Sequence, residues 1–356
     1  MKIAFNIDYD HLMYTGIGRY GLELISAWLR TGQDCELWMW RDTKKNPPDI
    51  DNVEKLIRYH PFPKRITDHF IPGIRARKSN IQWVHSANGL LLPPSAHFKQ
   101  ANMVHDLGPI LYGHMKCDSD TKVWKQRLAR LASSSDCILV NSRSTMNDLL
   151  NIFPATEGKV FLTPLGIDHF SRMHTAGKTR DHILTVGTVE PRKNIDGLLR
   201  AYSLLLQRRD VPPLIIAGKK EFRADEYQEL SMKLGLQNKV TFTGFTTDRK
   251  LADLYSRAYC LVHPAHHEGF GFTVPEAFTW GLPVVASNTG GLGEFFSEAA
   301  WMVDPSDPES IAHGIDRALD SGVTAEQQEK RDDLSRELTW ENCAIRTREA
   351  LETFGK

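Results

Sequence analysis

The chain has 356 residues, which is long for one hydrophobic core and comfortable for two, so its length predicts two domains. Its 44 lysine and arginine residues balance its 44 aspartate and glutamate residues, which argues against a global field that recruits nucleic acid. Five scattered cysteines without a C-x-x-C pair argue against a disulfide framework or a zinc ribbon and fit a reducing, cytoplasmic setting.

The first half alternates short apolar runs with helical patterns, as parallel α/β sheets do. In chain order, the apolar runs predict strands at 2–8, 35–40, 81–85, 103–106 and 137–141, and the periodic segments predict helices at 17–30 and 121–131. This half therefore predicts an N-terminal Rossmann-like domain over 1–168.

A polar stretch at 171–181 has no apolar periodicity and predicts a linker. The alternation then restarts, with strands predicted at 183–188, 214–217, 240–242, 259–263, 283–287 and 301–303, and helices at 195–207 and 275–280. We expect a second Rossmann-like domain over 175–335, followed by a C-terminal segment, 336–356, with an amphipathic helix at 341–354. Ligands of open parallel sheets bind at the carboxyl ends of strands, so functional motifs should follow strands directly.

The segment 267–278, His-Glu-Gly-Phe-Gly-Phe-Thr-Val-Pro-Glu-Ala-Phe, follows a predicted strand and carries two carboxylates eight positions apart. Glu268 falls in the predicted loop and Glu276 in the first turn of the next helix, where free backbone amides favour anions. An alternative for Glu276 is a capping box with Thr273, with Pro275 at the first helical position. Capping does not explain Glu268.

From Glu268 to Ala277 the chain reads E-G-F-G-x-x-x-x-E-A and resembles the E-x7-E motif of retaining GT-B glycosyltransferases of family four. The resemblance implies that Glu268 contacts hydroxyls of the donor sugar and that Glu276 binds the ribose of the nucleotide. It also implies donor contacts from the residues between them, Gly269, Phe270, Gly271, Phe272 and Thr273. The implied fold is GT-B, an α/β fold with two Rossmann-like domains facing across a cleft and the C-terminal helix returning to the N-terminal domain.

A second motif, Gly-Thr-Val-Glu-Pro-Arg-Lys-Asn at 187–194, lies between a predicted strand and a predicted helix. Its adjacent cations, Arg192 and Lys193, suit a diphosphate leaving group whose charge grows as the glycosidic bond breaks. A solvated basic turn is the alternative. Lys193 matches the phosphate-binding lysine of the related family, but Thr188 and Asn194 stand where many members have arginine and glycine. We therefore assign the missing charge to Arg192.

The segment 15–21 contains G-x-G-x-x-G at the start of a predicted helix. It fits a dinucleotide fingerprint, with Asp42 as the ribose-binding acid, but its first glycine comes eight residues after the strand rather than at the strand-helix turn. It also resembles the glycine loop with which the family's N-terminal domain meets the donor phosphates. We assign Gly16 and Gly18 to that role.

His105 and Asp106 end a predicted strand of the first half. A structural histidine is the alternative here, but the related family carries a histidine in this context, facing the donor sugar. His105 is therefore our candidate polar contact at the reacting centre, with Asp106 orienting its ring.

Two D-x-D triplets, 8–10 and 118–120, and three histidines, His263, His266 and His267, are the candidate metal ligands. The second triplet follows no strand, and the histidines lack complementary ligands at zinc spacing. Because Arg192 and Lys193 already supply positive charge, we expect a metal-independent enzyme without a cofactor.

The segment 64–78 carries five cations and one acid among scattered isoleucines and a phenylalanine. It is typical of a solvated surface element. The alternative is peripheral binding to an anionic membrane, such as the inner face of the plasma membrane, where a lipid-linked acceptor is presented. No apolar run reaches the ~20 residues of a membrane helix.

These predictions describe a retaining hexosyltransferase that moves mannose from GDP-mannose to a hydroxyl of a glycan or lipid-linked acceptor. The sequence of residues 186–194 resembles that of bacterial polysaccharide mannosyltransferases, so lipopolysaccharide O-antigen assembly is the expected setting. UDP-glucose and UDP-N-acetylglucosamine are alternative donors, with base contacts expected around 243–246. A nicotinamide-dependent oxidoreductase and a noncatalytic sugar-nucleotide-binding partner are the alternatives from other classes.

Overall fold

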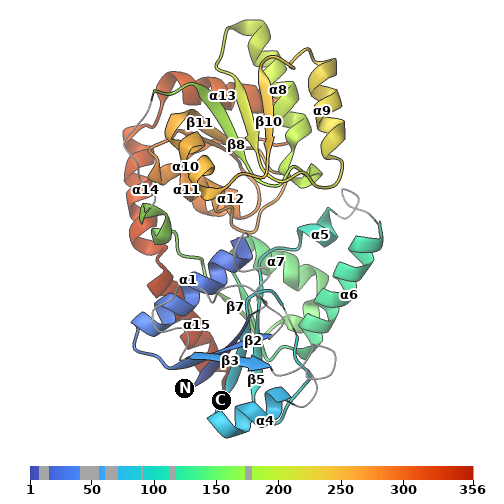
Figure 1. The fold of residues 1–356 in the computed structure, drawn as a ribbon, viewed down its shortest axis with the longest axis vertical. Coiled ribbons are helices and arrows are strands. Elements are labelled where there is room, and N and C mark those ends of the chain that lie inside the picture. Colours follow the sequence, from blue (N-terminus) through green and yellow to red (C-terminus); the bar gives the residue numbers. More distant parts are fainter. Residues whose placement is uncertain are drawn as a thin grey trace. The chain divides into compact units, whose positions relative to one another are not determined.

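The structure is a computed structural model that describes residues 1–7, 16–40, 56–60, 71–89, 91–112, 118–172 and 179–355. The 8–10 triplet, Asp42, the side chains of 118–120 and the 64–70 part of the basic segment lie outside the described residues. The chain forms two compact units (Figure 1). The first consists of Met1–Leu107, Val123–Gly166 and Leu338–Lys356, and the second of Gly108–Lys122 and Ile167–Glu337.

The first unit is built on a sheet of seven parallel strands in the order β3-β2-β1-β4-β5-β6-β7. Its strands are β1 (Ile3–Ile7), β2 (Cys35–Trp40), β3 (Ile57–His60), β4 (Trp83–Ser86), β5 (Lys99–Val104), β6 (Cys137–Val140) and β7 (Val160–Leu162). The helices along this part of the chain are α1 (Gly16–Arg30), α4 (Ile71–Ser79), α6 (Asp118–Ser134), α7 (Arg143–Ile152) and the short η3 (Pro154–Thr156). Because helices cover both faces of a parallel sheet, central strands are apolar on both sides, and β6 is buried at every residue.

The C-terminal helix, α15 (Trp340–Gly355), belongs to the first unit and packs against α1. Trp340 is fully buried, and its ring centroid lies 6.2 Å from that of Tyr20 on α1. Gly166 makes this packing possible, because a Cβ at that position would lie 2.3 Å from the backbone nitrogen of Trp340. The C-terminal helix is therefore part of the hydrophobic core of the first unit.

The second unit is built on a sheet of six parallel strands in the order β10-β9-β8-β11-β12-β13. Its strands are β8 (His182–Val186), β9 (Leu214–Ala217), β10 (Val240–Gly244), β11 (Ala258–His263), β12 (Val284–Ser287) and β13 (Trp301–Val303). Its helices are α5 (Gly108–Leu111), η4 (Asp168–Arg172), η5 (Pro191–Lys193), α8 (Ile195–Arg208), α9 (Ala224–Lys233), α10 (Asp248–Arg257), α11 (Thr273–Thr279), α12 (Gly290–Phe296), α13 (Pro308–Ser321) and α14 (Ala325–Glu337). The core lies between the sheet and helices such as α8 and α13, which pack against each other.

Both sheets have the doubly wound order, in which the first strand of the unit lies beside the fourth. In the first unit β1 lies beside β4, and in the second β8 lies beside β11. The predicted fold class, two Rossmann-like parallel-sheet units, is confirmed. No helix among the described residues has both the length and the apolar character needed to cross a membrane.

Candidate active site

The second sheet brings two motif loops together at its topological switch point. Connections from β8 and β11 leave the sheet in opposite directions, which opens a crevice at the carboxyl ends of these neighbouring strands. The loop after β8 carries Arg192 and Lys193, and the loop after β11 carries Glu268. The motifs lie about 75 residues apart in the chain and meet because their strands pair.

The loop after β8 is held by Asn194. Its backbone is in the left-handed region, with φ 58°, and its side chain caps α8 by accepting a bond of 3.2 Å from the amide of Gly197. Its Nδ2 donates to the carbonyl oxygens of Pro264, at 3.0 Å, and Pro305, at 2.7 Å. Asparagine tolerates this conformation better than most residues other than glycine, which explains how the departure from the family's glycine is accommodated. The two cations just before it lie in the 3₁₀ turn η5.

Glu268 is the centre of a buried charge cluster. Arg192 Nη1 lies 3.1 Å from Glu268 Oε2, and Lys193 Nζ donates to Glu268 Oε1. Arg192 also donates to the carbonyl oxygen of His267, at 3.0 Å, and pairs with Glu190. Burial would raise the pKa of Glu268, but the adjacent Lys193 and Arg192 outweigh it and hold that pKa well below its usual range. The carboxylate is therefore ionised at neutral pH.

His263, the last residue of β11, reaches the same carboxylate. Its Nε2 lies 3.2 Å from Glu268 Oε1, and its Nδ1 lies 3.2 Å from Thr273 Oγ1 at the start of α11. Burial lowers the pKa of His263, against the opposing effect of its bond to Glu268. Sequence reasoning considered this residue only as a metal ligand and missed the contact, which depends on the fold.

The capping-box interpretation of Glu276 is wrong. The helix α11 begins at Thr273, so Pro275 is its third residue rather than its first, and no side chain caps it. Instead, Glu276 Oε2 accepts a bond of 2.9 Å from the hydroxyl of Tyr255 on α10. Burial and the nearby Glu276 raise the pKa of Tyr255, so the phenol stays a donor.

Three glycines shape and support the loop of Glu268. Gly271 has φ 87°, and a Cβ there would lie 2.4 Å from Leu292 of α12. At the start of α12, a Cβ on Gly290 would lie 2.5 Å from the carbonyl oxygen of Glu268, and the amide of Gly291 donates to that oxygen at 2.7 Å. Sequence reasoning missed Gly290 and Gly291, although a glycine pair shortly after a predicted strand was a usable signal. Gly269, Phe270 and Phe272 complete this loop, and Phe270 is buried.

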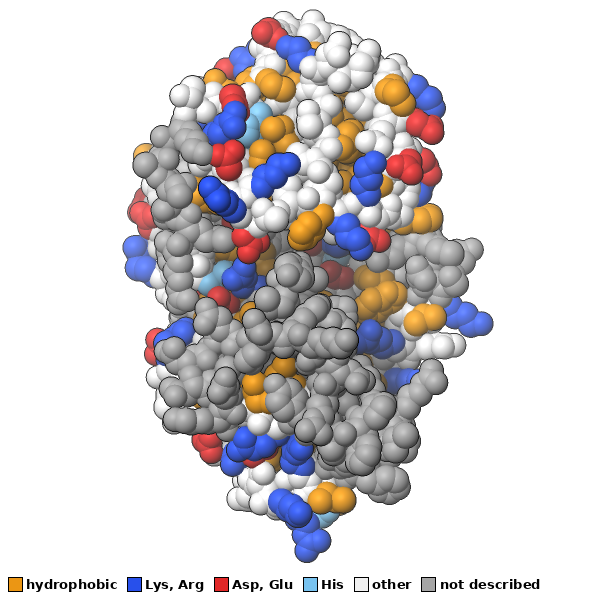
Figure 2. Space-filling model, in the orientation of Figure 1, with side chains coloured by type: hydrophobic (Ala, Val, Ile, Leu, Met, Phe, Trp, Pro, Cys, Tyr) orange, Lys and Arg blue, Asp and Glu red, His pale blue; other side chains and the backbone are white. Residues whose placement is uncertain are grey.

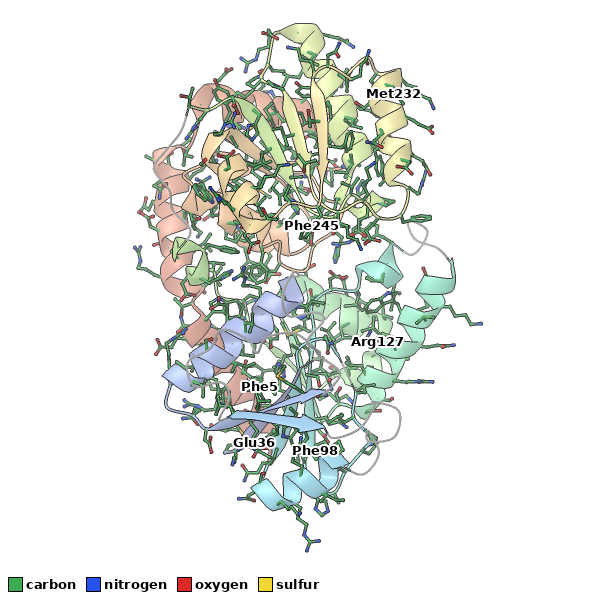
Figure 3. The ribbon with its side chains drawn as sticks, viewed as in Figure 1. Phe5, Glu36, Phe98, Arg127, Met232 and Phe245 are labelled. Atoms are coloured by element: carbon green, nitrogen blue, oxygen red, sulfur yellow. The ribbon has the colours of Figure 1, made fainter. Side chains whose placement is uncertain are left out.

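The base-contact segment predicted at 243–246 lies at the carboxyl end of β10, on the same edge of the second sheet. Phe245 follows that strand, and its side chain is 61% exposed (Figure 3). A large exposed aromatic ring at this edge is a feature that the sequence reading did not single out.

In the first unit, His105 follows the carboxyl end of β5. Its Nε2 lies 2.7 Å from the carbonyl oxygen of Ala87, and its ring meets that of Tyr20 edge-on, with centroids 5.1 Å apart. Burial lowers the pKa of His105, so the ring is neutral at pH 7. Gly16 and Gly18 lie in the first turn of α1, with Gly16 exposed and Gly18 buried.

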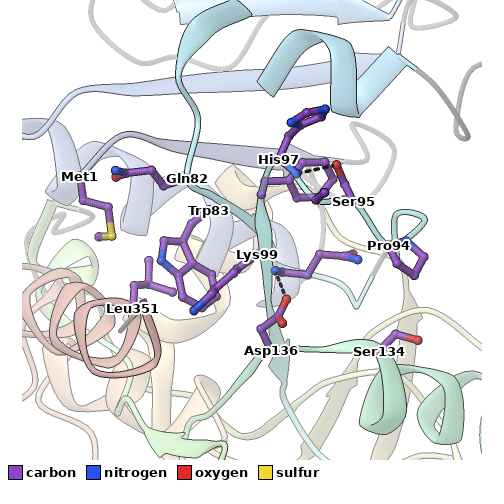
Figure 4. A pocket seen from close by; sticks show the side chains of 14 residues that line it. Met1, Gln82, Trp83, Pro94, Ser95, His97, Lys99, Ser134, Asp136 and Leu351 are labelled. Atoms are coloured by element: carbon purple, nitrogen blue, oxygen red, sulfur yellow. Dashed lines mark hydrogen bonds between the residues drawn. The ribbon is translucent and has the colours of Figure 1, made fainter. Parts of the chain in front are cut away.

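A cavity of about 620 Å³ lies elsewhere in the first unit, at the amino ends of β4 and β5 (Figure 4). Trp83, Lys99, Asp136 and Leu351 are among its lining residues. It lies at the edge of the sheet opposite to His105, whereas doubly wound sheets bind ligands at the carboxyl edge. We therefore do not assign a donor to it. Within the described ranges, no three histidine, cysteine or acidic side chains are grouped as a metal site.

Two units, each built on a doubly wound parallel sheet, form the fold of GT-B glycosyltransferases. Residues 167–337, just under half of the chain, match the family described as glycosyl transferases group 1. It is 25% identical over 375 residues to the O-antigen chain mannosyltransferase B of Escherichia coli, covering 98% of both chains. It is 34% identical over 170 residues to the serotype-specific mannosyltransferase WbdA of Escherichia coli, covering 46% of this chain and 21% of that one. Among solved structures, sucrose-phosphate synthase from Thermosynechococcus elongatus is similar, with a TM-score of 0.73 and 20% identity over 99% and 98% of the two chains.

Proposed function

We propose that the chain is a retaining hexosyltransferase that moves mannose from GDP-mannose to a hydroxyl of a glycan or lipid-linked acceptor. The observation that carries this proposal is the convergence of Arg192 and Lys193 on Glu268 at the switch point of the second sheet. Both Escherichia coli relatives are named as mannosyltransferases, which supports mannose as the transferred sugar.

In the proposed reaction, Arg192 and Lys193 stabilise the charge that develops on the diphosphate as the glycosidic bond breaks. Glu268 accepts hydrogen bonds from sugar hydroxyls, and Glu276 binds the ribose. The acceptor hydroxyl attacks from the face on which the diphosphate leaves, and the leaving phosphate takes its proton. The configuration at the anomeric carbon is thereby retained. Two cations supply the positive charge, so the proposed reaction needs no metal.

The roles of the first unit follow the same resemblance. We assign Gly16 and Gly18, in the first turn of α1, to the donor phosphates, and neutral His105 to the donor sugar. The acceptor is assigned to this unit. A peripheral membrane contact would bring a lipid-linked acceptor to it.

Thermal unfolding of the protein against GDP, GDP-mannose, UDP, UDP-glucose and NAD, each with and without EDTA, tests the donor. A ligand at 100 times its dissociation constant adds about 2.7 kcal/mol, enough to raise the unfolding midpoint by several degrees. We expect GDP and GDP-mannose each to raise the unfolding midpoint by the same amount with EDTA as without it. A higher midpoint with UDP compounds alone would make a UDP-sugar the donor in place of GDP-mannose. A higher midpoint with NAD alone would overturn the transferase proposal.

The stereochemical part needs a separate test. With GDP-mannose and a lipid-linked or glycan acceptor, proton NMR of the first product formed should show the α-anomer, the configuration of the donor. A β-product would contradict retention and leave the donor assignment standing.

A further inference from the structure

We propose that His263 is a positioning residue for Glu268, which it holds by donating a hydrogen bond from one fixed ring tautomer. This inference rests on the proposed function, since it concerns the glutamate that we assign to the donor sugar. His263 ends β11, is 2% exposed, and has a polar atom within 3.2 Å of each ring nitrogen. No role as a substrate contact or metal ligand is needed to explain it.

The hydrogen-bonding groups around the ring define the tautomer. Glu268 is ionised and can only accept, so Nε2 of His263 carries the hydrogen that points at Oε1. The neutral ring then has an acceptor at Nδ1, and the hydroxyl of Thr273 donates to it. The chain of bonds therefore runs from Thr273 through His263 to Glu268. It ties the first residue of α11 to the carboxylate five residues after the strand.

Glu268 has two other side-chain partners, and in the proposed function both also bind the diphosphate. Lys193 bonds the same oxygen, Oε1, and Arg192 bonds Oε2. In the proposed reaction these cations also bind diphosphate oxygens, so their hold on the carboxylate weakens as charge develops on the phosphate. His263 is neutral and buried, and it has no phosphate to bind. It is the partner that keeps the carboxylate oriented towards the sugar throughout the reaction, as outer partners orient ligands in metal sites.

The charged groups that face His263 are Glu268 from its own loop and the cations Lys193 and Arg192 from η5. Protonation of the ring would add a third positive charge to this cluster and would leave the Thr273 hydroxyl without its acceptor. Both effects favour the neutral tautomer and agree with the lowered pKa of His263.

Spectroscopy tests the tautomer without any activity measurement. Nitrogen-15 NMR of the full chain labelled at histidine, with the signals of His263 identified from the His263→Gln variant, should show a neutral ring protonated at Nε2 from pH 6 to 8. In Thr273→Val, Nδ1 loses its donor and its signal should shift. A ring protonated at Nδ1, or one that titrates near 6.5, would overturn the proposal.

Kinetics tests the positioning role. We expect His263→Phe to lower turnover about tenfold or more, with the dissociation constant of GDP changed less than about twofold, and His263→Gln to recover part of the turnover because its amide can donate from the position of Nε2. His182→Gln is the matched control, because His182 is 3% exposed and begins the neighbouring strand β8 at the opposite edge of the sheet. Full turnover in His263→Phe, or an equal loss of GDP affinity, would overturn the proposal. If the unmodified protein transferred no sugar, the proposed function would fail, and the NMR tautomer would still decide the role of His263.

Discussion

Asn194 donates through Nδ2 to the carbonyl oxygen of Pro264, and this 3.0 Å bond joins the loop after β8 to the loop after β11. A second bond from the same nitrogen reaches Pro305. The residue that departs from the family's glycine therefore ties the proposed phosphate-binding loop to the loop of Glu268. Glycine could adopt the same backbone conformation but could not make either bond.

We expect Asn194→Ala to lower the free energy of unfolding by about 2–4 kcal/mol, because it leaves buried carbonyls without donors and places a Cβ residue in the left-handed region. Asn194→Gly should cost about 1 kcal/mol less, since it loses the bonds but relieves the backbone. Urea unfolding measures both. Arg223→Gly, at an exposed left-handed position, relieves the backbone but loses an exposed ion pair with Glu226, so its stability should change by about 1 kcal/mol or less. Wild-type stability in Asn194→Gly would show that the bonds contribute nothing.

Lys193→Ala should lower turnover by about 10²–10³, the effect of removing one donor that stabilises transition-state charge. Lys193→Arg keeps the charge but not the geometry, so its turnover should fall between those of the wild type and Lys193→Ala. Steady-state kinetics with the donor found by thermal unfolding measures this. Lys219→Ala, which removes a lysine that is 69% exposed in the loop after β9, is the control. Near-normal turnover in Lys193→Ala would remove Lys193 from the site.

Glu268→Gln should be as damaging to turnover as Lys193→Ala, and it should also show the linkage between charge and stability. The folded-state pKa of Glu268 is depressed, so the ionised carboxylate stabilises the fold fully above its unfolded value of about 4.3, and this contribution is lost as pH falls towards the folded pKa. Wild type should therefore exceed Glu268→Gln in stability at pH 7, and the gap should narrow below pH 4.3. Unfolding at several pH values measures it. A constant gap from pH 7 to pH 3 would contradict the depressed pKa.

Phe245→Ala should weaken nucleotide binding about tenfold, since stacking of a base on an aromatic ring contributes about 1–3 kcal/mol. Isothermal titration with GDP measures the change. Met232→Ala is the control, because Met232 is 60% exposed on α9 of the same unit (Figure 3). Unchanged affinity in Phe245→Ala would place the base elsewhere.

Membrane contact through α4 can be tested with vesicles. Arg77 and Lys78 follow Ile74 by three and four positions, so each lies beside it on the helix surface, and Ile74 is 56% exposed. Basic side chains gather over this end of the first unit (Figure 2). At about 1 kcal/mol per cation, Arg77→Ala with Lys78→Ala should lower partitioning onto anionic vesicles about 30-fold at low salt. The exposed pair Arg249 and Lys250 on α10, changed together to alanine, is the control. Equal flotation of both variants would end this proposal.

The sequence by itself determined the strands that are marked by a short, local run of apolar residues. The predicted ranges 35–40, 214–217 and 301–303 coincide with β2, β9 and β13, because short apolar runs between turn residues are buried in any fold of this class. The same reasoning missed β3 (Ile57–His60) at the edge of the first sheet. Apolar and polar residues alternate within this short segment, and it becomes a strand only by pairing with β2.

The sequence also pointed to Glu268, Arg192 and Lys193, because charged residues in loops that directly follow predicted strands are candidate ligand contacts. It could not determine their partners. Only the pairing of β8 with β11 brings the two loops together, and only the start of α11 decides whether Thr273 caps a helix or bonds His263. Residue types are local properties that a sequence displays, whereas distances between residues about 75 positions apart depend on the whole sheet.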